Sequence, residues 1–292
     1  MKLDGRRKSS NVEDRRGLST GAKAGIGGIG GIIIIALMTF MSGGNLGDVV
    51  TNVVQQGGLT AQTETPAGQR EFTEEEQQLA EECAQILAST EDVWTEVFRQ
   101  NGLGEYQPPT LVLFTNSVNS ACGSATAAVG PFYCSGDQKL YVDLSFFTEM
   151  KKQLGVQGNT FAYAYVIAHE IGHHVEYSLG ILGKAHQQMS QMDKAQANQV
   201  SVRLELLADY YAGVWAHYED QKNHSLEYGD MEKGLELAKA IGDDWLQKRA
   251  QGYAQPESFT HGTSEQRKRW LKRGYETGDM QTTTFTGAYS DL

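Results

Sequence analysis

Positive charge is scarce in this sequence. Its 25 Lys and Arg residues stand against 36 Asp and Glu residues, which gives a net charge of -11. Because binding to nucleic acid depends mainly on Lys and Arg neutralising phosphates, this balance argues against a nucleic-acid partner. Internal repeats are also missing, and the composition excludes collagen, a coiled coil and a fully disordered chain. With 292 residues, 40% of them hydrophobic, the chain is expected to form at least one globular domain.

Cysteine is scarce as well, with three residues. Cys122 and Cys134 flank a short glycine-rich loop, and we expect them to form a disulfide. In the loop-entropy model such a bridge stabilises the fold by roughly 3 kcal/mol. Cys83 occupies an apolar position of an expected helix and is interpreted as a buried thiol.

Residues 24–42 form the one long apolar run, and it contains no charged side chain. As a helix this run would span roughly 28 Å, which matches the hydrocarbon core of a bilayer. A cleaved signal peptide and a buried soluble helix are the alternatives. A polar stretch of about twenty residues precedes the run, and this favours an uncleaved transmembrane anchor. Gly27 and Gly31 form a G-x-x-x-G within it, a weak pattern for a homodimer.

The charges on the two sides of this run differ in sign. Residues 1–23 hold seven basic and three acidic residues, whereas the remainder holds 18 basic and 33 acidic residues. The positive-inside rule therefore predicts a single-pass protein of the cell membrane, with a basic cytoplasmic tail over residues 1–23 and an extracytoplasmic remainder. Residues 43–70 are rich in Gly, Thr, Gln and Asn and are expected to form a flexible linker.

The globular domain is expected over residues 71–280, followed by a C-terminal tail over residues 281–292. Hydrophobic periodicity predicts a small sheet followed by a helical bundle, a mainly helical α+β fold. Strands are expected over Thr110–Thr115 and Lys139–Leu144. Helices are expected over Thr73–Gln100 (one helix, or two with a break near Ser89), Phe146–Leu154, Thr160–Leu179, Lys194–Glu219, Met231–Ala250 and Ser264–Tyr275.

An H-E-x-x-H motif lies inside the helix expected over Thr160–Leu179. Its histidines, His169 and His173, are four residues apart, so both imidazoles project from one helix face and can share a metal. Glu170 points to the side, where it can take a proton from a water activated by zinc, as in peptide hydrolysis. Two histidines hydrogen-bonded in a helix interface are the structural alternative.

A catalytic zinc site needs a third protein ligand and an open position for water. Position 179 is Leu, which rules out a metzincin-type third histidine. The next long helix offers Glu205 and Asp209 on one face, with Ala208 and Gly213 among the small residues that would let it pack close to the first helix. We therefore expect Glu205 to be the third ligand and Asp209 to accept a hydrogen bond that fixes the tautomer of a ligand histidine.

Other candidates allow two interpretations each. His261 precedes the last expected helix and would either donate to the oxyanion of the reaction or staple that helix to the domain. Arg267 would pair with a buried acid or bind a substrate carboxylate, and the structural role is favoured. Tyr133 is a further oxyanion candidate. His174 faces away from its neighbour His173, which favours a supporting or surface role over metal binding.

These motifs together carry a resemblance. The segments VIAHEIGHHVE, SVRLELLADYYAGVWA, GPFYC with LYVDLSFF, and ESFTHGTSEQRKRWL resemble the neutral zinc metallopeptidase family of bacteria, single-pass membrane proteins similar to gluzincins, over about residues 71–278. The resemblance implies a zincin-like catalytic domain with zinc held by His169, His173 and Glu205, and a peptide or protein substrate. In such folds an edge strand aligns the substrate, and the strand chosen here is the one expected over Lys139–Leu144.

The sequence departs from the family pattern at three positions. Leu207 and Tyr210 stand where the pattern has Gln and Cys, and Glu176 stands where a Gln is common. The main alternative function is a non-enzymatic, membrane-tethered scaffold or binding module that holds zinc. A metal-dependent hydrolase of a non-peptide bond is a second alternative.

Overall fold

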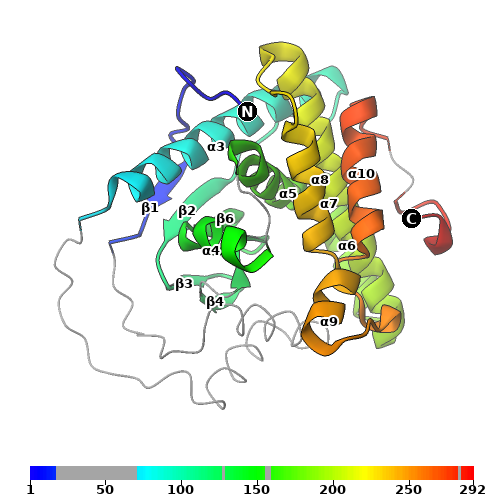
Figure 1. Cartoon of the computed structure of the whole chain (residues 1–292). Helices are drawn as coiled ribbons and strands as arrows, with labels where there is room; N and C mark the ends of the chain where they lie inside the picture. The colour runs from blue at the N-terminus through cyan, green and yellow to red at the C-terminus, as the bar shows by residue number, and fades with distance from the viewer. Residues whose placement is uncertain (18–70, 127–128, 155–158, 282–283) are drawn as a thin grey trace.

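The computed structural model describes residues 1–17, 71–126, 129–154, 159–281 and 284–292. It shows a mixed α+β fold that is mostly helical with small sheets, as predicted (Figure 1). The predicted anchor over residues 24–42, with Gly27 and Gly31, and the predicted linker over residues 43–70 lie outside the described residues. Among the helices of the described parts of the chain, none combines the length and apolar composition that crossing a bilayer requires.

The first long helix, α3, runs without a break over Glu74–Gln100. Thr73 starts it with a capping box, because its side chain accepts from the N–H of Glu76 and the Glu76 side chain accepts from the N–H of Thr73. The alternative of a break at Ser89 is wrong. The Ser89 side chain is buried and donates to Glu219 at 2.6 Å, so this polar residue is satisfied inside the helix packing.

A four-stranded sheet lies beside α3 in the order β1-β2-β6-β5 (Figure 1). The pairs β1–β2 and β2–β6 are parallel, and β5–β6 is antiparallel. A separate hairpin is formed by β3 and β4. The two predicted strands are confirmed as β2 and β6. The strand bounds are β1 Val12–Asp14, β2 Thr110–Phe114, β3 Ser117–Ser120, β4 Gly123–Thr126, β5 Phe132–Cys134 and β6 Lys139–Asp143.

Seven further α-helices follow the sheet in the described part of the chain. Their bounds are α4 Ser145–Leu154, α5 Thr160–Ser178, α6 Ile181–Met189, α7 Lys194–Asn223, α8 Asp230–Ala240, α9 Asp243–Gln251 and α10 Ser264–Thr277. The expected single helix over Met231–Ala250 is wrong, because the chain breaks into α8 and α9 at Gly242. A Cβ at Gly242 would lie 2.4 Å from the backbone nitrogen of Ser264, so the start of α10 crosses the chain at this point.

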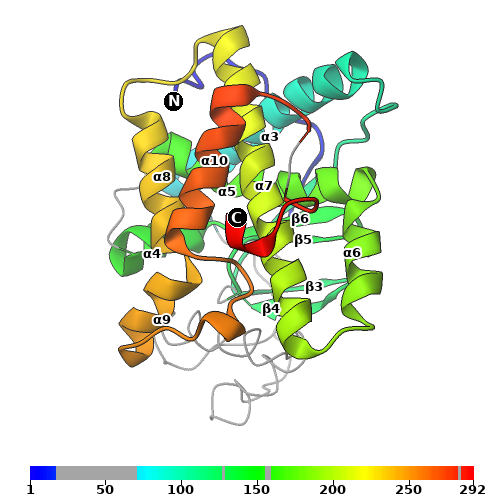
Figure 2. The same cartoon turned by 90° about the vertical axis from the view of Figure 1, so that its right-hand side faces the viewer.

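The core forms where α5, α7 and α10 pack together (Figure 2). Helix α5 is apolar on most sides and is covered by α3, α7 and α8. Helix α7 contacts both α5 and α10, which explains why its fully buried residues include Trp215 as well as Asp209. The two helices that carry the predicted metal ligands therefore lie side by side in the interior.

Residues 1–17, called the N-terminal arm below, belong to the folded domain. Strand β1 of the arm pairs with β2, and Leu3 of the arm is buried in the main core. The expectation of a separate tail over residues 1–23 and a domain beginning at residue 71 therefore needs correction for residues 1–17. The physical reason is that basic side chains of the arm pair with buried acids of the domain, Arg6 with Glu219 and Arg7 with Glu91.

The last residues also pack on the domain instead of forming the expected tail. Arg203 of α7 donates to the backbone carbonyl of Gly287 at 3.1 Å and to that of Thr284. Leu292 is buried, with 2% of its surface exposed. Residues 284–292 thus lie against α7.

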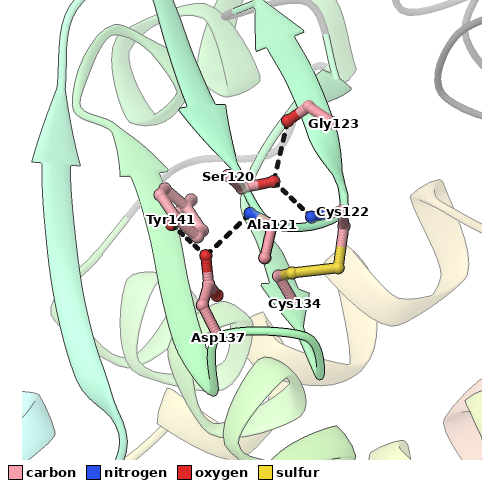
Figure 3. Close-up of a disulfide and its surroundings, with 7 residues drawn as sticks. All are labelled: Ser120, Ala121, Cys122, Gly123, Cys134, Asp137 and Tyr141. Carbon is pink, nitrogen blue, oxygen red and sulfur yellow. Dashed lines mark hydrogen bonds between the residues drawn. A yellow bond between two sulfur atoms is a disulfide. The ribbon is translucent and has the colours of Figure 1, made fainter.

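The predicted disulfide between Cys122 and Cys134 is confirmed (Figure 3). It ties the turn after β3 to the end of β5. Asp137 supports the same turn, since its carboxylate accepts from the N–H of Ala121 at 2.9 Å and from the hydroxyl of Tyr141 at 2.7 Å. Cys83 is a buried free thiol, as expected.

Candidate metal centre

Two histidines of α5 and one glutamate of α7 converge on a single point. The Nε2 atom of His169 lies 3.2 Å from Oε2 of Glu205, and the Nε2 atom of His173 lies 3.5 Å from Oε1 of the same carboxylate. One ligand atom from each residue lies within 4.8 Å of the others. The side chains of His169, His173 and Glu205 remain 9%, 15% and 17% exposed, so the cluster is reachable from solvent.

The close approach of α5 and α7 depends on Gly172, the residue before His173. A Cβ at Gly172 would lie 2.8 Å from the Cα and the carbonyl oxygen of Ala208. Small residues therefore bring the two helices together, as predicted for Ala208. Gly213 has a different role from the one expected, because its missing Cβ makes room for the Leu271 backbone of α10.

Asp209 lies behind the first ligand histidine. Its Oδ1 atom is 2.8 Å from Nδ1 of His169 and also accepts from the hydroxyl of Tyr165 at 2.6 Å. Arg267 of α10 donates to both Asp209 oxygens, from Nε at 2.8 Å and from Nη2 at 3.0 Å. The arginine thus pairs with a buried acid, the interpretation favoured from sequence. Asp209 orients His169 so that Nε2 faces Glu205.

Glu176 holds the second ligand histidine in the same manner. Its Oε2 atom lies 2.9 Å from Nδ1 of His173, and its carboxyl group is fully buried. The other oxygen, Oε1, has no hydrogen-bond partner among the described residues. Sequence reasoning noted Glu176 only as a departure from the family pattern. Its position three residues after His173 on the same helix was the signal that could have assigned it this contact.

The charges of these carboxylates act on both histidines. Burial lowers the pKa of His169, but the charge and hydrogen bond of Asp209 outweigh it and raise the pKa to about 9. Burial likewise opposes the charge of Glu176 at His173, and the pKa of His173 rises well above its usual value. The charges of Asp209 and Glu176 therefore favour the charged form of both rings in the metal-free protein, and a bound cation would have to displace a proton from each ring.

Glu170 lies beside this cluster on α5 and is partly exposed. Burial raises the pKa of its carboxyl above the usual value, and the charges of His169 and His173 oppose that rise. The backbone N–H of Tyr133 on β5 also acts on the carboxylate and lowers its pKa. Glu170 therefore lies between the cluster and strand β5.

Tyr133 and His174 form a further contact between β5 and α5, one helical turn after Glu170. The Nε2 atom of His174 lies 2.8 Å from the carbonyl oxygen of Gln107, so this nitrogen donates. Burial lowers the pKa of His174, which keeps the ring neutral, and its Nδ1 therefore accepts from the Tyr133 hydroxyl at 2.9 Å. The hydroxyl of Tyr133 is already used in this bond, which argues against its role as an oxyanion donor.

His261 lies on the loop before α10, where Asp243 at the start of α9 organises the chain. Asp243 Oδ2 accepts from the N–H groups of Thr260, His261 and Gly262 at 2.7 to 3.0 Å. Its Oδ1 lies 3.2 Å from Nδ1 of His261. Burial lowers the pKa of His261, but the charges of Glu205 and Asp243 outweigh it and raise the pKa.

His261 acts in turn on the third candidate ligand. Burial raises the pKa of the Glu205 carboxyl, but the charge of His261 and the hydrogen bonds of both ligand histidines outweigh it and hold the pKa well below the usual value. The charge of His261 therefore acts on Glu205 of the candidate metal centre, while Nδ1 of His261 lies against Asp243.

The sheet presents a different strand to the cluster from the one expected. Strand β6, within the expected Lys139–Leu144, lies between β2 and β5, so its backbone groups are paired on both sides. Strand β5 is the outer strand on this side among the described residues, and it contacts α5. The choice of Lys139–Leu144 as the edge strand is therefore wrong. Strand β5 was too short, at three residues, to be recognised by alternation.

Comparison with known proteins agrees with this site. The family model described as "Putative neutral zinc metallopeptidase" matches residues 1–285. A relative in Escherichia coli (strain K12), "Uncharacterized protein YpfJ", is 43% identical over 292 residues, which cover 98% of this chain and 99% of the relative. "Uncharacterized protein Mb2605" of Mycobacterium bovis is 40% identical over 200 residues, 65% of each chain. No solved structure matches.

Proposed function

Because this chain belongs to the neutral zinc metallopeptidase family, we propose that it is a zinc-dependent peptidase that hydrolyses peptide bonds, with a zincin-like catalytic domain. One observation carries the proposal. Two imidazoles and a carboxylate from neighbouring helices place their ligand atoms within 4.8 Å of one another, and all three remain partly open to solvent. A structural zinc site would close all four positions with protein atoms.

The chemistry of the donor set fits zinc. Zinc in hydrolases is bound by imidazole nitrogens and a carboxylate oxygen, with one position left open. His169 and His173 turn Nε2 toward Glu205 because Asp209 and Glu176 hold their Nδ1 atoms. When bound there, zinc supplies the Lewis acidity that activates water and polarises a peptide carbonyl.

Glu170 is proposed as the general base. It is adjacent to His169 but points away from the ligand face, so its carboxylate is free to take the proton of the attacking water. The raised pKa of Glu170 supports this role, because a base whose pKa lies closer to neutrality also returns the proton to the leaving amine more readily.

His261 is proposed as the donor to the oxyanion that forms at the substrate carbonyl. Its Nδ1 faces Asp243, which leaves Nε2 for the substrate, and the charges of Glu205 and Asp243 raise the pKa of the ring and so favour its charged form. A charged donor held in place before the reaction stabilises the transition state more than the ground state. Strand β5 is proposed to align the substrate by backbone pairing along its outer edge.

A comparison of the wild type with Glu170→Gln tests this function. The full chain is incubated with a peptide library in zinc-containing buffer, and the products are identified by mass spectrometry. The wild type is expected to cleave, and Glu170→Gln is expected to bind zinc equally while losing at least about 1,000-fold in rate, because a base and its proton return are both lost. Glu236→Gln, an exposed glutamate of α8, is the matched control and should cleave like the wild type.

Cleavage by Glu170→Gln at the rate of the wild type would reject Glu170 as the base. An absence of cleavage by the wild type across the library, with zinc bound, would favour a zinc-holding binding module instead.

A further inference from the structure

We propose that the N-terminal arm and the metal-bearing domain occupy the same side of the membrane, so that no membrane separates residues 1–17 from residues 71–292. This replaces the single-pass arrangement expected from the charge pattern. The inference rests on the contacts of the arm and does not depend on the proposed peptidase activity.

The first observation is that the arm supplies a strand of the sheet. In β1, Val12, Glu13 and Asp14 are in register with residues 111–113 of β2. The pairing continues at both ends, since the N–H of Leu111 donates to the carbonyl of Asn11 at 2.9 Å and the N–H of Arg15 donates to that of Leu113 at 2.7 Å. The arm therefore covers the edge of β2 with main-chain hydrogen bonds, which are lost if the arm is elsewhere.

The second observation is that buried acids of the domain take their cations from the arm. Glu219 of α7 is fully buried and accepts from both terminal nitrogens of Arg6. Glu91 of α3 is 6% exposed and pairs with Arg7 at 2.9 Å, while the Ser9 hydroxyl donates to it at 2.5 Å. A buried carboxylate left without its partner is strongly destabilising, so the domain requires the arm.

The third observation explains the charge asymmetry on which the single-pass topology was based. Four basic side chains of the arm pair with acids of the domain. These pairs are Lys2–Glu227, Arg6–Glu219, Arg7–Asp92 and Lys8–Glu81. Arg15 and Arg16 pair with Glu13 and Asp14 inside the arm. The positive charge at the start of the chain thus complements the acidic domain. This pairing explains the charge asymmetry without the positive-inside rule.

The fourth observation is that the chain leaves and re-enters the domain at one place. The guanidinium carbon of Arg16 lies 4.1 Å from the ring centroid of Phe72, and its Nη1 donates to the carbonyl of Glu76 at 2.8 Å. Residues 17 and 72 are therefore neighbours across the gap in the described chain (Figure 1). A membrane between the arm and the domain would break every contact described above.

Thiol labelling of the full chain in intact cells tests the inference. Ser10→Cys on the arm and Lys184→Cys on α6 replace exposed residues, so neither change disturbs the core. The wild type is the control for background, because Cys83 is buried and the other two cysteines are bonded. Cells are treated with a membrane-impermeant maleimide before and after the inner membrane is opened.

Both positions are expected to label under the same condition. If one position labels in intact cells and the other only after the membrane is opened, the arm and the domain lie on opposite sides and the proposal is overturned.

A second variant tests docking directly. Glu13→Cys with Val112→Cys places two thiols at registered positions of adjacent strands, within the Cα separation that a disulfide accepts.

Oxidation of this double variant in isolated membranes is expected to give one intramolecular cross-link, read as a shift on a non-reducing gel that depends on both cysteines. Failure to cross-link in protein that still binds zinc would show that the arm is undocked, and this outcome would also overturn the proposal.

Discussion

Gly172 of α5 faces Ala208 of α7 so closely that a Cβ on Gly172 would lie 2.8 Å from the Ala208 Cα. Gly172 lies between Glu170 and His173, and Ala208 is three residues beyond Glu205. The contact that brings the two helices together is therefore made next to the residues that meet at the candidate metal centre.

The substitution Gly172→Ala should weaken zinc binding. The added methyl group has to push α7 away, and this separates Glu205 from the two histidines while costing about 1 to 3 kcal/mol of stability through overpacking. Zinc affinity measured by chelator competition and unfolding in urea report the two effects. Gly183→Ala on α6 is the matched control, because a Cβ there meets nothing within 4 Å and should leave zinc affinity unchanged. Equal affinities for both variants would contradict this role of Gly172.

The carboxylates behind the ligand histidines should tune zinc affinity without binding the metal. Asp209→Asn and Glu176→Gln keep an oxygen that can accept from His169 and His173 but remove the negative charge. Each is expected to weaken zinc binding by about 10-fold to 100-fold. Competition with a chelator at constant pH measures the change. Unchanged affinity in Glu176→Gln would mean that this carboxylate is kept for packing alone.

His261 should affect the rate and not the metal. His261→Ala is expected to lower kcat by about 100-fold to 1,000-fold while zinc content and KM change little, because the donor acts mainly in the transition state. Steady-state cleavage of a peptide found in the library experiment measures both constants. His224→Asn, at the exposed end of α7, is the control. Loss of zinc in His261→Ala would assign His261 to metal binding or to local folding.

Docking of the N-terminal arm should weaken in acid. Burial raises the pKa of the Glu219 carboxyl, but the hydrogen bonds of Arg6 and Ser89 outweigh it and hold the pKa below its usual value. A depressed carboxyl pKa contributes stability that is present above the unfolded value and is lost as pH falls through the folded value. The arm should therefore become more sensitive to protease as the pH falls below about 4.3, the usual value for a glutamate.

The variant Glu219→Gln serves as the comparison for this pH effect. It removes the titrating group but keeps a hydrogen-bond acceptor, so protease sensitivity of its arm should vary less over the same range. An identical pH profile in both proteins would assign the acid sensitivity to other groups.

The centre of the site could be predicted from sequence because each ligand lies in a long periodic helix. Helical spacing alone places His169 and His173 on one face, and it places Glu205 and Asp209 on one face of the next helix. The contact of Asp209 with His169 then follows from packing those faces together. Strands β2 and β6 were likewise found because each is a short run with β-branched and aromatic residues, bounded by turn residues.

The features that the sequence did not predict are short strands and charged residues whose partners are distant in the chain. Strands β1 and β5 have three residues each, too few for alternation to show. Glu176 carries a charge in a buried position, and only the tertiary contact with His173 reveals its role. The basic residues of the N-terminal arm were interpreted as a signal for membrane topology. The sequence does not show that Arg6 and Arg7 pair with buried acids of α7 and α3.

Diffraction at the zinc absorption edge from crystals of the zinc-loaded full chain tests the central claim most directly. The account predicts one anomalous peak per chain within bonding distance of Nε2 of His169, Nε2 of His173 and a carboxylate oxygen of Glu205, with the fourth position taken by water. A peak coordinated by four protein atoms, or a peak beyond bonding distance of Glu205, would contradict it.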